Sequence, residues 1–187
     1  IEKSWKGFVR SGAKLNAEEQ KQFSTINERL SVLGATFGQN VLADEKIPAL
    51  ILADSEELAG LPDWLKAAMA SAATERGHEG KFAVTLSRSI IEPFLTFSTR
   101  RDLREAAFTA WVKRGEMQDA HDNRPLVKEM LALRAEKAKL LGYPSFAAFK
   151  LDETMAKTPD AVNDLLGNVW NRAVKRALEE EGALAEL

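Results

Sequence analysis

The chain has 187 residues, of which 45% are hydrophobic and 29% are charged, so one large domain or two small ones can bury a substantial core. Its 26 lysines and arginines against 28 acidic residues give a formal net charge of −2, which argues against a basic nucleic-acid-binding domain. The absence of cysteine excludes disulfides, a thiol nucleophile and cysteine-ligated metal sites.

The first ten residues have the pattern of the end of a helix and lack the apolar stretch of a signal peptide. No run approaches the roughly 18 apolar residues that cross a bilayer, so we expect no membrane segment and a cytoplasmic location. The chain has no starting methionine, and residues 183–187 carry no helix-terminating signal. We therefore expect a piece of a longer protein.

A long helix is predicted over residues 17–43, with Asn16 as its N-cap and Glu18 and Glu19 in its first turn. Apolar side chains recur at steps of three and four, which places them on one stripe of the helix. The first helix of the chain is the expected antiparallel neighbour of this stripe. The stripe consists of Phe23, Ile26, Leu30, Leu33, Phe37 and Val41.

Two short apolar runs, at residues 49–53 and 82–86, have the composition of buried strands. A helix that begins after Pro62 and ends near Arg76 separates them, and Gly77 follows as its C′ residue. We expect the two runs to pair in a small sheet within an otherwise helical protein.

Everything after residue 86 has a helical pattern. Glu92 and Pro93 are expected to begin one short helix, and Thr99 and Thr158 are the expected caps of two later ones. The fold class predicted is mainly α, with long antiparallel helices and one small β element, organised as a single helical unit over residues 1–187. The later helices are expected at 100–114, 125–141, 145–152 and 159–181.

The two histidines do not form a recognisable metal site. His78 and Glu79 begin like the zinc motif H-E-x-x-H, but the residue four positions after His78 is Phe82, and glycines surround the pair. His121 lies in a polar loop in which Asp122 or Asn123 is expected to cap the following helix. We expect no metal ligand in this chain.

Three arginines form the one local cluster of positive charge that suggests binding, namely Arg100, Arg101 and Arg104. An anionic partner, either a peptide carboxylate or a nucleic acid, is one interpretation. A solvated helix face balanced by Asp102 and Glu105 is the other, and it is the more common situation. No nucleophile elbow and no phosphate-binding glycine loop is present.

The four tryptophans fall in separate predicted helices. We expect them to anchor the core rather than to form a surface on which nucleic-acid bases stack. They are Trp5, Trp64, Trp111 and Trp170.

A series of short segments is distributed in order over nearly the whole chain: FVRSGAKL at 8–15, INERL at 26–30, TFGQNVL at 36–42, LAGLP at 58–62, RRDLRE at 100–105, DNRPL at 122–126, LLGYPSFA at 140–147 and MAKTP at 155–159. Taken together, these segments resemble the bacterial peptidyl-dipeptidases (dipeptidyl carboxypeptidases). These enzymes belong to the thimet-oligopeptidase-like family of zinc metallopeptidases.

The resemblance implies a large helical peptidase built as two halves that flank a deep channel. Its zinc site is an H-E-x-x-H helix in the C-terminal half plus a glutamate from the next helix, and no position of this chain matches those residues. The chain is then a piece of the non-catalytic N-terminal region, which approaches the catalytic region from about residue 124. No catalytic, cofactor-binding or metal-binding residue is transferred to it, so zinc is expected in the parent enzyme alone.

The function expected from the resemblance is channel wall in a zinc metallopeptidase, either a peptidyl-dipeptidase that removes C-terminal dipeptides from short peptides or an oligopeptidase. The chain alone would be inactive. Its expected partners are short peptides and the missing catalytic half, with neither nucleic acid nor membrane, and with self-association through surface that the missing half would cover. The alternative is a freestanding helical module that binds a peptide or a protein without cutting it.

Overall fold

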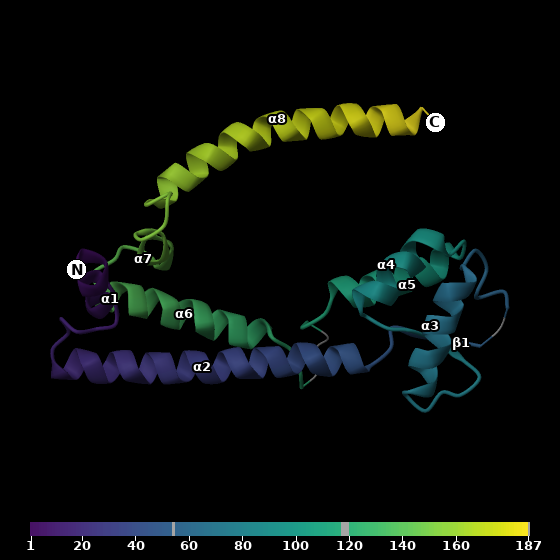
Figure 1. Cartoon of the computed structure of the whole chain (residues 1–187), viewed down its shortest axis with the longest axis horizontal. Coiled ribbons are helices and arrows are strands. Elements are labelled where there is room, and N and C mark those ends of the chain that lie inside the picture. Colours follow the sequence, from purple (N-terminus) through teal and green to yellow (C-terminus); the bar gives the residue numbers. More distant parts are fainter. Residues whose placement is uncertain (54, 117–119, 187) are drawn as a thin grey trace. The chain divides into compact units, whose positions relative to one another are not determined.

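The computed structural model describes residues 1–53, 55–116 and 120–186, and Figure 1 shows its elements. The predicted mainly α fold and its small β element are both confirmed. The elements in chain order are α1 (Glu2–Arg10), α2 (Ala17–Lys46), β1 (Leu50–Leu52), α3 (Asp63–Thr74), β2 (Phe82–Val84), α4 (Arg88–Phe97), α5 (Arg101–Val112), α6 (Arg124–Leu140), α7 (Phe146–Leu151) and α8 (Pro159–Ala185).

The chain folds into two compact units. One consists of Ile1–Glu28 and Leu131–Leu187, and the other of Arg29–Met130. The boundaries between them fall inside α2 and α6. The expectation of a single helical unit over the whole chain stays a prediction.

The start of α2 is held by a reciprocal pair of hydrogen bonds, as its sequence predicts. The Asn16 side chain accepts from the Glu19 amide at 3.0 Å, and the Glu19 carboxylate accepts from the Asn16 amide at 2.9 Å. This capping box supplies acceptors to two backbone amides at the start of the helix, which have no partner within the helix itself. Ile26 and Leu33 of the predicted apolar stripe are buried.

α6 runs alongside α2, a neighbour that the sequence analysis did not predict (Figure 1). The predicted neighbour α1 meets only the start of α2, where Phe8 lines a depression together with Gln20 and Phe23. Arg29 donates to the Glu129 carboxylate at 2.5 and 2.7 Å, and Lys137 donates to Asn27 at 2.5 Å. The helix α1 has nine residues and cannot cover a helix of 30 residues, whereas α6 has 17.

The core of the unit Arg29–Met130 is built on the two strands and α3 to α5. β1 and β2 pair antiparallel, with Ile51 opposite Ala83. Because successive strand residues face opposite sides, this register directs Leu52 and Val84 into the core. The side chains packed there include Leu52, Leu65, Met69, Val84, Ile91 and Phe94, all at most 1% exposed.

Two helix starts differ from the sequence prediction. α4 begins at Arg88 rather than at Glu92, so Pro93 lies inside the helix. Proline offers no amide to the carbonyl four residues earlier, which belongs to the exposed Ser89, where water can replace the missing bond. The N-cap position of α5 is Arg100 instead of Thr99 and has no side-chain capping bond, while the Thr99 amide donates to the Ala59 carbonyl at 3.1 Å.

The prediction that the tryptophans anchor the core is wrong for three of them. Trp5, Trp64 and Trp170 are between 52% and 68% exposed, while Trp111 packs partly buried against the core. Apolar spacing places a side chain on a helix face but does not tell which face another element covers. Among the described residues, no helix is both long and apolar enough to cross a membrane.

Candidate functional site

The three arginines singled out from the sequence gather where α4 ends and α5 begins, but two of them are engaged within the chain, one with the backbone and one with a carboxylate. Arg104 donates to the Ser98 carbonyl at 2.5 Å, at the junction between the helices. Arg100 forms a two-pronged ion pair with Asp102 at 2.7 and 3.0 Å. The Arg100 hydrogen bonds hold the pKa of the Asp102 carboxyl below its usual value.

Arg101 is the member of the cluster that takes no part in these contacts. It is exposed on the first turn of α5, and the described part of the chain gives it no ion pair within 4 Å. The geometry therefore leaves Arg101 as the arginine that can reach an anionic group of another molecule.

The histidines lie in turns, as expected. The His78 amide donates to the Ala73 carbonyl at 2.9 Å after the end of α3. His121 precedes Asp122, whose carboxylate accepts from the Arg124 amide at 2.9 Å and so helps to cap α6. The Arg124 side chain bonds the same carboxylate and lowers its pKa. Within residues 1–53, 55–116 and 120–186, no three histidine or acidic side chains are placed to share a metal ion.

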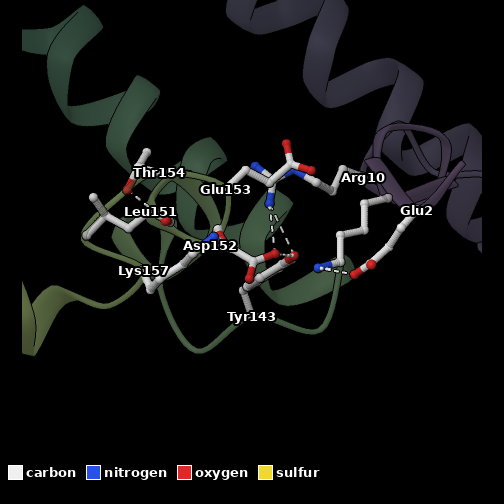
Figure 2. A network of polar contacts seen from close by, with 9 residues as sticks. Glu2, Arg10, Tyr143, Leu151, Asp152, Glu153, Thr154 and Lys157 are labelled. Atoms are coloured by element: carbon white, nitrogen blue, oxygen red, sulfur yellow. Dashed lines mark hydrogen bonds and ion pairs between the residues drawn. The ribbon is translucent and has the colours of Figure 1, made fainter. Parts of the chain in front are cut away.

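A charged cluster that the sequence analysis missed joins α1 to α7 (Figure 2). The Arg10 guanidinium donates to the Tyr143 hydroxyl at 3.2 Å and to the Asp152 carboxylate at 3.4 Å, and it also lies 3.4 Å from Glu153. Its Cζ is 4.2 Å from the centre of the Phe149 ring. The partners lie 133 to 143 positions apart in sequence, so no local pattern could have indicated them.

The central hydrogen bond of this cluster runs from the Tyr143 hydroxyl to the Asp152 carboxylate at 2.9 Å. Partial burial raises the pKa of Tyr143 above its ordinary value of 10.0, and the bond to Asp152 raises it further, while Arg10 acts in the opposite direction. The Arg10 side chain is only 14% exposed. An arginine so fully engaged holds two helices together and has little capacity left for a ligand.

The single tyrosine of the chain makes this cluster measurable. Because only one tyrosine is present, tyrosinate absorbance in a pH titration reports Tyr143 alone. We expect a folded pKa above the unfolded value of about 10. Asp152→Asn should lower this pKa only part of the way to the unfolded value, because burial is the larger cause of the shift and remains in the variant. Arg10→Met should raise it.

The pH dependence of stability follows from the same shift in the pKa of Tyr143. A pKa raised by folding means that the fold favours the protonated phenol, so this contribution is complete below pH 10 and is lost as the pH rises through the raised value. Asp164→Asn, at an exposed position of α8, serves as the control and should leave the titration unchanged. A shift of Tyr143 in the same direction in both cluster variants would contradict the assignment.

A second buried polar cluster holds α2 against the segment before α6. The Asp44 carboxylate, 4% exposed, accepts from the Gly115 amide at 2.6 Å. The Asn40 side chain donates to the Asn123 side chain at 2.9 Å, and Asn123 in turn donates to the Phe37 carbonyl at 3.2 Å. Every one of these bonds ends on the protein itself, so the cluster anchors the helix to this segment.

A depression of about 620 Å³ lies in the same unit, between the end of α2, α3 and the start of α4. Its charged side chains are of both signs, with Arg76 and Lys46 opposed by Glu45 and Glu75. Arg76 is already bonded to the Ala72 carbonyl at 2.9 Å. Thr85 and Ser87, which also line the depression, are hydrogen-bonded to each other at 2.9 Å.

The decisive observation comes from comparison with known proteins. The family model described as "Peptidase family M3" matches residues 94–187, which is half of the chain. The chain belongs to peptidase family M3. This family consists of zinc metallopeptidases, and the resemblance inferred from the sequence segments is confirmed.

Three relatives show how much of an M3 peptidase the chain represents. The dipeptidyl carboxypeptidase of Escherichia coli is 34% identical over 92% of this chain but over 25% of its own length. Oligopeptidase A of Haemophilus influenzae is 33% identical over 96% of this chain and 27% of its own length. The probable cytosolic oligopeptidase A of Arabidopsis thaliana is 32% identical over 94% of this chain and 26% of its own length. The chain thus spans about a quarter of these M3 relatives.

The residues present do not fit a zinc site of the M3 type. Such a site needs two histidines on one helical face and a further carboxylate. The only two histidines of the chain are 43 positions apart and both lie outside helices. No step of zinc chemistry can therefore be assigned to these residues.

Proposed function

We propose that this chain forms part of the non-catalytic helical wall of a zinc peptidase that removes C-terminal dipeptides from short peptides. The zinc centre is then built from sequence outside these 187 residues, and the chain alone is inactive. A cytoplasmic location belongs to the same proposal and is supported by the cytosolic description of the Arabidopsis relative.

One observation carries the proposal. The chain is similar over 92% of its length to a dipeptidyl carboxypeptidase, yet it spans only a quarter of that relative. The similarity therefore concerns one region of a much larger enzyme. The two clusters around Arg10 and Asp44 hold helices together, as a wall requires, and neither contains a free nucleophile.

The alternative is a freestanding helical module that binds a peptide or a protein without cutting it. It is favoured by α8, which has no buried residue and exposes several large apolar side chains. A module of this kind would bind peptides at a surface and release them intact.

The test compares the natural gene product with the isolated 187-residue chain. Zinc content is measured by mass spectrometry, and both proteins are given one short peptide with a free C-terminus and the same peptide with a C-terminal amide. We expect zinc and dipeptide release from the free-acid peptide in the gene product, and neither in the isolated chain. Stoichiometric zinc or cleavage in the isolated chain would refute the proposal.

The other outcomes separate the remaining functions. Cleavage of both peptides at internal bonds would indicate an oligopeptidase. A zinc-free gene product that binds the peptides intact would establish the interaction module.

Arg101 is the proposed contact for the substrate carboxylate, because Arg100 and Arg104 are occupied within the chain. Loss of one charge-assisted contact corresponds to roughly a tenfold weakening. Arg101→Glu in the gene product should therefore raise KM for the free-acid peptide by that factor and leave kcat unchanged. Lys113→Glu makes the same charge change at the other end of α5 and should alter neither constant. An unchanged KM for Arg101→Glu would exclude the contact.

A further inference from the structure

The helix α8 carries an apolar stripe that nothing in the described chain covers. The stripe follows two rows at spacings of four, and its large side chains are between 37% and 68% exposed. The opposite side carries polar residues such as Asp164, Asn168 and Lys175. We call this surface the α8 stripe, and its residues are Leu165, Leu166, Val169, Trp170, Val174 and Leu178.

A helix of this kind needs a partner. α8 has 27 residues and none of them is buried, although the stability of helices in proteins comes mostly from packing of an apolar face. Rows of side chains at spacings of four are the ridges that fit into the grooves of another helix. The partner expected for this surface is therefore a helix with an apolar face.

The C-terminal end of the stripe indicates that the partner carries a positive charge there. Glu181 lies 11 residues after Trp170, which is close to three full turns, so both are on the same side of the helix. Arg176 is paired with Glu179 and Glu180, and α8 has no basic residue in its last turn. A carboxylate in this position is unfavourable next to the negative end of the helix dipole. The partner is expected to supply a lysine or arginine there.

We infer that the α8 stripe is the docking surface for an amphipathic helix from the part of the M3 polypeptide that lies outside these 187 residues. This inference rests on the proposed function. The family match includes all of α8, and the relatives have about three quarters of their length beyond the matched region. The polypeptide available to cover the stripe is thus long.

A second copy of the chain is the competing occupant. Arg172 and Arg176 lie seven and 11 residues after Leu165, so they border the stripe on the side of Leu165, whereas Glu181 borders it on the side of Trp170. Arg176 is already paired with Glu179 and Glu180 of its own helix, so a partner of different sequence is better placed to supply a cation to Glu181.

Hydrogen exchange measured by mass spectrometry tests this inference. Peptides from α8 are compared in the natural gene product and in the isolated 187-residue chain. We expect α8 to exchange at least about 100-fold more slowly in the gene product, because its amides open only when the docked helix separates. Peptides from α3, whose packing lies within the chain, should exchange alike in both proteins and serve as the internal reference.

Two pairs of variants of the gene product locate the contact. Trp170→Glu should remove the protection of α8, while Asn168→Glu, which adds the same charge on the opposite side, should keep it. Glu181→Lys should weaken the protection about tenfold by placing two cations together, and Glu179→Lys should have a smaller effect. The second pair alters only exposed positions, so it remains informative if Trp170→Glu prevents folding.

The outcomes distinguish this inference from the proposed function. A zinc-loaded, active gene product whose α8 exchanges as fast as in the isolated chain would overturn the docking while leaving the function intact. An inactive, zinc-free gene product with a protected α8 would overturn the proposed function while leaving the docking of α8 intact. Cross-links from Trp170→Cys that join two copies would assign the α8 stripe to a dimer instead.

Discussion

Replacing Gly60 with alanine is expected to destabilise the unit Arg29–Met130 by roughly 3–4 kcal/mol. Gly60 has a φ of +83°, a conformation that costs an L-residue about 1–2 kcal/mol. A Cβ at this position would lie 2.4 Å from the Phe97 carbonyl oxygen and 3.1 Å from the Thr99 nitrogen. Both are backbone atoms at the junction of α4 and α5, so they cannot move aside without disturbing two helices.

A second glycine separates the cost of the backbone conformation from the cost of the steric clash. Gly77 has a φ of +78°, nearly the same backbone conformation, but a Cβ there would meet nothing within 4 Å. Gly77→Ala should therefore cost only the conformational penalty of about 1–2 kcal/mol. The free energies of unfolding are measured with urea, using tryptophan fluorescence and circular dichroism. Equal losses in the two variants would show that the close approach of Gly60 to the next helix is not a source of stability.

Phe94→Ala is the second large effect, with an expected loss of about 3–5 kcal/mol. Phe94 is fully buried in the core between α3, the strands and α5. Truncation removes its transfer free energy and also leaves a cavity, because the surrounding helices and the sheet can only partly collapse into the space. A loss of this size is a large fraction of the stability of an ordinary domain.

Phe108→Ala is the matched control for this substitution. Phe108 is 50% exposed on α5, so the same change of atoms should cost about 1 kcal/mol or less. Urea unfolding of the two variants under the same conditions gives the comparison. A cost for Phe94→Ala no greater than that for Phe108→Ala would contradict the placement of the core.

The candidate site shows what a local pattern can indicate. The run RRDLRE predicted a cluster of arginines at a helix start, and the structure places it there. The pair of Arg100 with Asp102 spans two residues and fits the balanced-charge interpretation, whereas the bond from Arg104 to the Ser98 carbonyl depends on the turn between α4 and α5. Arg101 emerges as the available member by elimination in the structure.

The sequence by itself determined the elements whose causes are local. The Asn16 cap with its returning Glu19, and the Thr158 cap followed by Pro159, mark helix starts through contacts of three residues' span. The two short apolar runs with a helix between them predicted the strands, and the ordered segments predicted the M3 family. These signals are local because the atoms that make them are neighbours in the chain.

Only the tertiary structure decided which surfaces meet. Arg10 pairs with Asp152 across 142 positions, and α2 is accompanied by α6, a helix far away in sequence. Pro93 stays inside α4, since the helix is held by the burial of Ile90, Ile91 and Phe94 in the core rather than by its own propensity. The same periodicity that buries one side of a helix also describes the exposed α8 stripe. Spacing in sequence fixes the face of a helix, and the packing of distant segments fixes whether that face is covered.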